Sequence, residues 1–238
     1  QPEDLGLTPD GGRVELSSGG EARTDEEDAE GAERSFTRHE AVRTRTFWFL
    51  VAAFSIASLG LVGYHSNWHS YFTGSQGFSA ATAAYAVSFY ALFAMFARFA
   101  WGSMADKFHP KKLMVIGTFA TATSIVFMRT VDTTPELLAF GVFHGLSIGS
   151  YFVLQPLVMA RYFGRAHLGS IFGVIRPAMT LFGASSPILV GALFDAQGNY
   201  KVAFALVAAC WFVASALLLV TVAPKRLRQA AAQPEPAG

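Results

Sequence analysis

The chain has 238 residues, of which 52% are apolar and only 15% are charged. A soluble globular domain usually carries about 25% charged residues. Here residues 1–45 hold 18 of the charges, whereas residues 46–222 hold only 13. This distribution argues against a soluble enzyme, and a net charge of +1 gives no basic surface of the kind that binds nucleic acid. A single cysteine, Cys210, cannot form an internal disulfide or a cysteine metal site.

The N-terminal segment is acidic: seven of the thirteen residues from 21 to 33 are Asp or Glu. Such a segment has too little apolar surface to fold by itself. We therefore expect residues 1–45 to form a cytoplasmic, disordered linker; the alternative is a docking segment for a basic partner. Residues 1–30 contain no apolar stretch that would form a signal peptide. Residues 223–238 are expected to form a cytoplasmic tail.

Six apolar segments follow the acidic region. A bilayer core about 30 Å thick requires about 20 apolar residues of helix, whereas a membrane β-strand needs about 9–11 residues of alternating character. The segments are long and do not alternate, so we expect helices over residues 46–64, 80–102, 113–128, 137–160, 168–194 and 202–222. Short connections join them, which predicts an all-α integral membrane protein with one transmembrane bundle over residues 46–222.

Lysine and arginine in the short loops predict the orientation of the bundle. Twelve basic residues lie on the side of the chain termini and two on the other side. We therefore expect both termini in the cytoplasm and the bundle in the cell membrane, plasma or inner. The two residues on the outer side are Arg129 and Lys201.

Two arginines lie inside the predicted spans. Arg98 precedes Asp106 by eight residues, and Arg176 follows Leu168 by eight. At about 1.5 Å per residue, both lie about 12 Å from the cytoplasmic boundary. Each is also on the middle helix of a group of three, as an inverted three-plus-three repeat with a site near the midplane would require.

The spans as drawn contain no Asp or Glu to neutralise these arginines. Charged side chains inside a bilayer usually face the bundle interior or a cavity. A guanidinium binds a carboxylate through two parallel hydrogen bonds. The pair Arg98 and Arg176 therefore predicts a site for an anion with one or two carboxylates. The alternatives are that Arg98 extends to the membrane surface and that Arg176 pairs with a carbonyl.

Three polar residues are weaker candidates for the substrate site. His144 is either a buried structural histidine or part of a proton relay. Gln155, beside Pro156, could bind a substrate or a neighbouring helix. His65 would line an outer vestibule or lie in a loop. Nearby aromatic residues are interpreted as an interfacial belt: Tyr64, Trp68 and Tyr71.

The run Gly145-Leu146-Ser147-Ile148-Gly149 reads G-x-S-x-G, like the nucleophile region of a rhomboid-type intramembrane protease. That chemistry needs a histidine within hydrogen-bond reach of the serine. Rhomboids carry it on the sixth helix, but no histidine follows His167 here. His144 lies one turn from Ser147 on the same helix, which is a poor geometry for a base. The small residues therefore indicate close helix packing, and we expect no enzymatic activity.

The loop after the second span carries the most specific motif. It reads Gly102-Ser103-Met104-Ala105-Asp106-Lys107-Phe108-His109-Pro110-Lys111-Lys112. This resembles the major facilitator signature G-x-x-x-D-[RK]-x-G-x-[RK]-[RK], with His109 at the position of the second glycine. In that family the loop holds one state of the transport cycle. The resemblance assigns this conformational role to Gly102, Asp106, Lys107, Lys111 and Lys112.

Two further motifs resemble the oxalate:formate antiporter and monocarboxylate transporter branch of this family. The run Pro2-Glu3-Asp4-Leu5-Gly6-Leu7-Thr8-Pro9-Asp10-Gly11 is similar to the segment after helix 6 of that branch. Pro187, Gly191 and Asp195, each four residues apart, are similar to the end of helix 11. The resemblance implies that the six spans are helices 7 to 12, one half of a twelve-helix major facilitator fold.

The same resemblance bears on the site residues. Members of the branch carry a substrate-binding arginine on helix 8, which Arg98 matches. The oxalate:formate type also has a basic residue on helix 11, a role that Arg176 would fill. Monocarboxylate transporters often have an aspartate four residues before the helix-8 arginine, where this chain has Ala94.

Together these features predict secondary active transport of small organic anions, mono- or dicarboxylates, by alternating access. The partners would be the lipid bilayer, the carboxylate and an N-terminal six-helix half. The sequence contains no phosphate-binding loop motif of the kind that would indicate ATP use. We also expect no cofactor or metal. Two alternatives remain open: a half-sized protein that acts as a homo-oligomer, and a non-transporting membrane sensor or scaffold that signals through residues 1–45.

Overall fold

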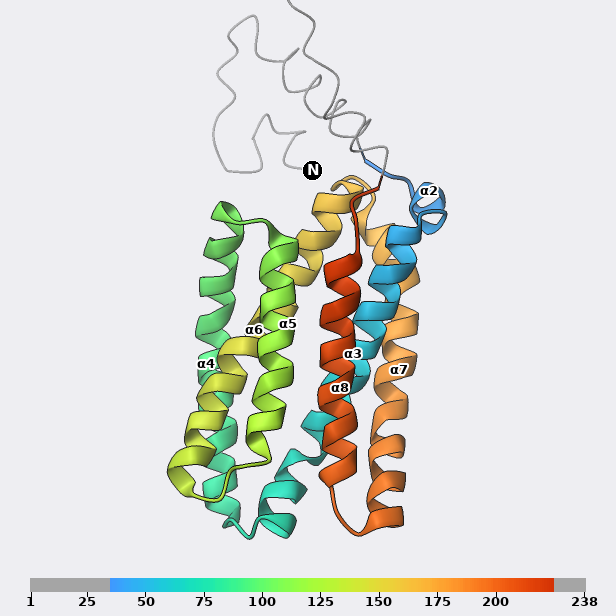
Figure 1. The fold of residues 1–238 in the computed structure, drawn as a ribbon. Helices are drawn as coiled ribbons and strands as arrows, with labels where there is room; N and C mark the ends of the chain where they lie inside the picture. The colour runs from blue at the N-terminus through green and yellow to red at the C-terminus, as the bar shows by residue number, and fades with distance from the viewer. Residues whose placement is uncertain (1–34, 225–238) are drawn as a thin grey trace, which may run out of the picture.

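The computed structural model describes residues 35–224, which form a bundle of long helices (Figure 1). A short helix, α2, precedes six helices that are long and apolar enough to cross a membrane. The elements are α2 (Arg38–Val42), α3 (Arg45–Ser70) with its π-helical extension η2 (Tyr71–Ser75), α4 (Ala80–Lys107), α5 (Pro110–Met128), α6 (Thr134–Phe163), α7 (Leu168–Gln197) and α8 (Lys201–Val220). The described residues contain no strand, so the predicted all-α membrane bundle with six spans is confirmed.

The helices extend beyond most of the predicted spans. The largest differences are at α3, which continues through η2 to Ser75 instead of ending at residue 64, and at α4, which ends at Lys107 instead of residue 102. Apolar composition marks only the part of a helix that lies in hydrocarbon, whereas backbone hydrogen bonding continues into the polar ends. The end of α4 has a local cause, because Pro110 disfavours helical backbone in the residue before it.

Residues just before α3 pack on the bundle, unlike the linker expected over residues 1–45. The backbone N–H of Phe36 donates to the Phe163 carbonyl at the end of α6, at 2.8 Å. Ala41 in α2 is fully buried. Residues 1–34 and 225–238 lie outside the described residues, and so do the expectations for the acidic segment and for most of the tail.

We call the end of the bundle where α3 begins its basic end, and the opposite end its far end. At the basic end α4, α6 and α8 end and α5 and α7 begin. The described basic residues there are Arg38, Arg43, Arg45, Lys107, Lys111, Lys112, Arg161 and Arg165. Those of the loops at the far end are Arg129 and Lys201. The basic end is at the top of Figure 1.

The helix pairs that pack most extensively are related by a simple exchange. They are α4 with α6, α3 with α7, α5 with α6, α3 with α8, and α5 with α8. Exchanging α3 with α6, α4 with α7 and α5 with α8 converts this set of pairs into itself. The packing therefore has the symmetry of an inverted three-plus-three repeat, with α5 and α8 together in front and α4 and α7 at the two sides in Figure 1.

Glycines on α6 allow α4 to approach closely. A Cβ atom at Gly145 would lie 2.6 Å from the Tyr90 carbonyl oxygen, and one at Gly149 would lie 2.6 Å from the Ala97 Cβ. Gly141 faces the Ala86 carbonyl in the same way. Small residues at four-residue spacing are a usual means of helix association in lipid, where no hydrophobic effect drives one helix onto another.

The helices α4 and α7 are the least buried of the six. Large apolar side chains on both are exposed, including Phe99 at 74% and Ile188 at 76%. In a membrane such surfaces contact lipid or another part of the protein. The two middle helices of the repeat are therefore the ones that this bundle leaves open.

Gly145→Ala should lower the apparent melting temperature of the protein in detergent, because its new Cβ meets a backbone carbonyl that cannot move away. Overpacking of this kind costs about 1–3 kcal/mol. Gly191→Ala on α7 is the matched control, since no atom lies within 4 Å of the added Cβ. Thermal unfolding followed by circular dichroism measures both variants. Equal melting temperatures would contradict the close α4–α6 contact.

Candidate functional site

The two arginines of the spans lie at closely similar depths in the folded bundle. Arg98 is nine residues before the last residue of α4, and Arg176 is eight residues after the first residue of α7. At about 1.5 Å per residue these positions are about 12–14 Å from the basic end. Both side chains are exposed on the surface of the bundle.

An aromatic ring lies close to each guanidinium group. The Cζ atom of Arg98 is 5.0 Å from the centre of the Phe152 ring on α6. The Cζ atom of Arg176 is 5.9 Å from the ring centre of Phe172 on its own helix. Cation–π contacts of this kind hold a guanidinium in place without neutralising its charge.

Gln155 lies one turn after Phe152 on α6 and is buried. Its Nε2 donates to the Sδ atom of Met179, which lies three residues after Arg176, at 3.3 Å. Gln155 thus bridges α6 to the helix that carries Arg176. We call Arg98, Phe152, Gln155 and Arg176 the arginine site.

Prolines release backbone carbonyls close to the arginine site. Pro156 has no N–H, so the carbonyl of Phe152 lacks its usual helical donor. Pro177 has the same effect on the carbonyl of Gly173. Freed carbonyls in a membrane helix occur where other groups or a water-filled cavity satisfy them.

The acidic residues of the described chain lie far from the arginine site. Three acidic residues lie within the membrane-spanning helices, and each is in an end turn: Asp106 in α4, Glu136 in α6 and Asp195 in α7. Asp106 is eight residues from Arg98, or more than two helical turns. The arginine site therefore carries positive charge with no carboxylate of the described residues beside it.

The two candidate histidines meet each other toward the far end. Their ring centres are 6.0 Å apart. The Nδ1 atom of His144 is 2.8 Å from the Ser124 hydroxyl, while its buried Nε2 has no hydrogen-bond partner. The Nε2 atom of His65 is 3.2 Å from the Tyr90 hydroxyl. Since Tyr90 is eight residues from Arg98, this cluster is about 12 Å from the arginine site along α4.

The aromatic residues near His65 contradict the interpretation as an interfacial belt. Tyr64, Trp68 and Tyr71 are all buried inside the bundle. Tyr64 packs against His144 with ring centres 4.6 Å apart. The interpretation was wrong because α3 does not end at residue 64, and its continuation places these rings against α6 and α8. The spacing of positions 64, 68 and 71 places the three rings on one face of a helix, and the tertiary structure shows that this face is buried.

Ser147 does not pair with a histidine side chain. Its hydroxyl donates to the backbone carbonyl of His144 at 3.0 Å. The His144 ring is bonded to Ser124 instead. Gly145 and Gly149 lie against α4, so the G-x-S-x-G run is a helix-packing face.

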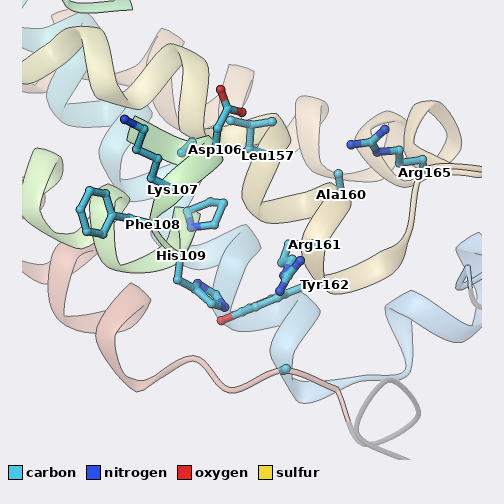
Figure 2. A pocket seen from close by; sticks show the side chains of 12 residues that line it. Asp106, Lys107, Phe108, His109, Leu157, Ala160, Arg161, Tyr162 and Arg165 are labelled. Atoms are coloured by element: carbon cyan, nitrogen blue, oxygen red, sulfur yellow. The ribbon is translucent and has the colours of Figure 1, made fainter. Parts of the chain in front are cut away.

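The signature loop borders a pocket of about 800 Å³ at the basic end (Figure 2). Asp106 and Lys107 form the last turn of α4, and His109 caps α5 by accepting the Lys111 N–H at its Nδ1. His109 has φ of −65°, so this turn needs no glycine. Partial burial, together with the positive charges of Arg161, Lys111 and Lys112, holds the pKa of His109 below its usual range.

Three further residues of the predicted conformational loop, Gly102, Lys111 and Lys112, do not line this pocket. The Nζ of Lys111 donates to the carbonyls of Leu219 and Thr221, at 2.9 and 2.6 Å. It thereby caps the C-terminus of α8, where a cation is favoured. Lys112 is exposed. A Cβ at Gly102 would make only an ordinary contact of 3.8 Å with Val153.

Comparisons with known proteins place the chain among membrane transporters. It is 26% identical over 181 residues to the probable nitrate/nitrite transporter NarK2 of Mycobacterium tuberculosis, covering 73% of this chain and 45% of that protein. It is 33% identical over 98 residues to monocarboxylate transporter 12-B of Danio rerio, covering 41% and 20%. It is 23% identical over 167 residues to the nitrite extrusion protein of Bacillus subtilis, covering 68% and 41%. The chain thus spans less than half the length of each of these relatives.

The chain also matches the sequence model of a protein family. The match covers residues 47–238, which include nearly all of α3 and all of the other five membrane-spanning helices. The match reaches well beyond half of the chain, and the protein therefore belongs to the Major Facilitator Superfamily.

Proposed function

We propose that this chain is the C-terminal half of a twelve-helix secondary transporter that moves small organic anions across a membrane by alternating access. The observation that carries the proposal is the pair of arginines, which lie at similar depths on the two middle helices of the repeat. No carboxylate of the described chain lies beside them. A substrate anion would supply the missing negative charge.

The chemistry of the arginine site suits a flat anion with oxygen atoms at its edge. A guanidinium donates two parallel hydrogen bonds to such a group. The Cζ atom of Arg98 lies over the Phe152 ring at 5.0 Å from its centre, a contact that leaves the positive charge of the guanidinium available to an anion. The carboxylate groups of mono- and dicarboxylates fit this description, and one of the relatives is named a monocarboxylate transporter. Nitrate and nitrite, named in the other relatives, share the same planar geometry and form the second candidate class.

Alternating access requires a second half that rocks against this one. In transporters of this type the site lies near the bilayer midplane, at the interface of the repeats. The open surfaces of α4 and α7 suit contact with an N-terminal six-helix half. The loop from Gly102 to Lys112, which carries Asp106 and Lys107, would hold one state of the cycle.

The charge distribution supports an orientation in the cell membrane. Eight described basic residues lie at the basic end, against Arg129 and Lys201 in the loops of the far end. Positively charged short loops stay in the cytoplasm. The basic end would therefore be cytoplasmic, with both termini of this chain on that side.

Replacing Arg176 or Arg98 by Gln should reduce anion uptake by about 10- to 100-fold, because a hydrogen bond to a charged group contributes about 1.5–3 kcal/mol. Uptake is measured with the full-length transporter in proteoliposomes. Arg129→Gln removes the same charge at the far end and serves as the matched control. Uptake that is unchanged in both variants would remove the arginine pair from the site.

The substrate class is tested by exchange. Proteoliposomes loaded with unlabelled formate, lactate or oxalate should accelerate entry of the corresponding labelled anion, and the Arg176→Gln variant should lose the acceleration. Loading with nitrate serves as the competing case. Acceleration by nitrate alone would replace carboxylates by nitrate while leaving the transporter proposal in place.

The orientation is tested by cysteine labelling in a Cys210→Ser background. A membrane-impermeant maleimide should label Thr130→Cys, at the far end, in intact cells. Phe108→Cys, at the basic end, should react only after permeabilisation. Both positions are exposed, so access to the reagent depends on the side of the membrane. The reverse labelling pattern would invert the bundle.

A further inference from the structure

The pocket at the basic end carries an unbalanced charge. It lies between the end of α4 and the end of α6, and its charged or titratable lining residues are Asp106, Lys107, His109, Arg161, Tyr162 and Arg165. Figure 2 shows Arg161 and Tyr162 projecting from α6 near His109, with Asp106 at the α4 side. Three permanent cations thus face one carboxylate in a space of about 800 Å³. Partial burial and the nearby charges of Arg161, Lys111 and Lys112 lower the pKa of His109, which also lines the pocket.

The described chain begins at the edge of this pocket. The hydroxyl of Ser35 accepts the backbone N–H of Ala166 at 3.4 Å. A Cβ at Gly164 would meet Ser35 at 2.3–2.7 Å, which shows how closely the two segments pack. Together with the hydrogen bond from Phe36 to Phe163, these contacts hold Ser35 beside Arg165. The segment that precedes Ser35 is therefore attached to the bundle next to Arg165.

The residues that precede Ser35 have the complementary charge. Residues 21–33 contain seven Asp or Glu and one basic residue, Arg23. Glu30 is five residues from Ser35, an extended reach of about 17 Å. We propose that the pocket between the ends of α4 and α6 binds residues 21–33 of the same chain, whose carboxylates pair with Lys107, Arg161 and Arg165.

The tether makes weak ion pairs sufficient. An exposed ion pair by itself contributes little, because water and salt screen it. A short connection holds the acidic residues at an effective concentration of the order of millimolar, so several weak pairs act together. The contact would join the segment before the bundle to the signature loop. It does not depend on which anion the protein transports.

Zero-length cross-linking with a carbodiimide tests the proposal, because this reagent joins a carboxylate only to an amine in direct contact. The full-length protein is reconstituted in phosphatidylcholine vesicles, and cross-linked peptides are identified by mass spectrometry. Lys107, in the pocket, should cross-link to residues 21–33. Lys112 is the matched control, since it is exposed on the same loop but does not line the pocket.

Lys107 should cross-link about fivefold more than Lys112, and the preference should disappear in 1 M salt, where charges are screened beyond about 3 Å. The double variant Arg161→Gln with Arg165→Gln should reduce the Lys107 product by about fivefold. Equal, salt-independent cross-linking of both lysines in the unmodified protein would overturn the proposal, whether or not the double variant folds. Loss of the Lys107 product when phosphatidylglycerol replaces part of the phosphatidylcholine would also overturn it, and would assign the pocket to lipid phosphate.

Discussion

The close approach of α4 to α6 is the contact on which the candidate site depends. In hydrocarbon no hydrophobic effect drives helices together, so backbones must come near enough for packing and weak polar contacts to hold them. Gly141, Gly145 and Gly149 provide that approach. The same contact places Arg98 of α4 against the ring of Phe152 on α6. In the equivalent helix pair, α3 with α7, Arg176 lies on α7. The arginine site is thus a consequence of how the repeat packs.

The basic residues divide the molecule into two regions for which we propose anionic partners. The arginine site lies within the span, and no carboxylate of the described residues is beside it; a carboxylate there would compete with the proposed substrate anion. The pocket at the basic end lies outside the span, where ion pairs are weak and reversible. The first region suits an anion that must bind and leave. The second suits a contact that forms and breaks with the state of the protein.

The histidine cluster has a different character from both. His65 and His144 lie among aromatic rings about 12 Å from the arginine site along α4. The hydrogen bond between His144 and Ser124 connects α6 to α5, and the contact between His65 and Tyr90 connects α3 to α4. The cluster therefore joins helices of both repeats at the end away from the signature loop.

The six spans followed directly from the sequence, because a bilayer core requires apolar stretches of about 20 residues of helix, and stretches that are this long and do not alternate are helices and not barrel strands. The depths of Arg98 and Arg176 followed as well, since the rise of a helix converts residue number into distance. Three features required the tertiary structure: the burial of Tyr64, the meeting of His65 with His144, and the placement of Ser35 beside Arg165. Each depends on which helix faces which, and six uniformly apolar helices do not encode their partners in their composition. Shape decides that pairing, through glycines that admit a neighbour and bulky side chains that exclude one.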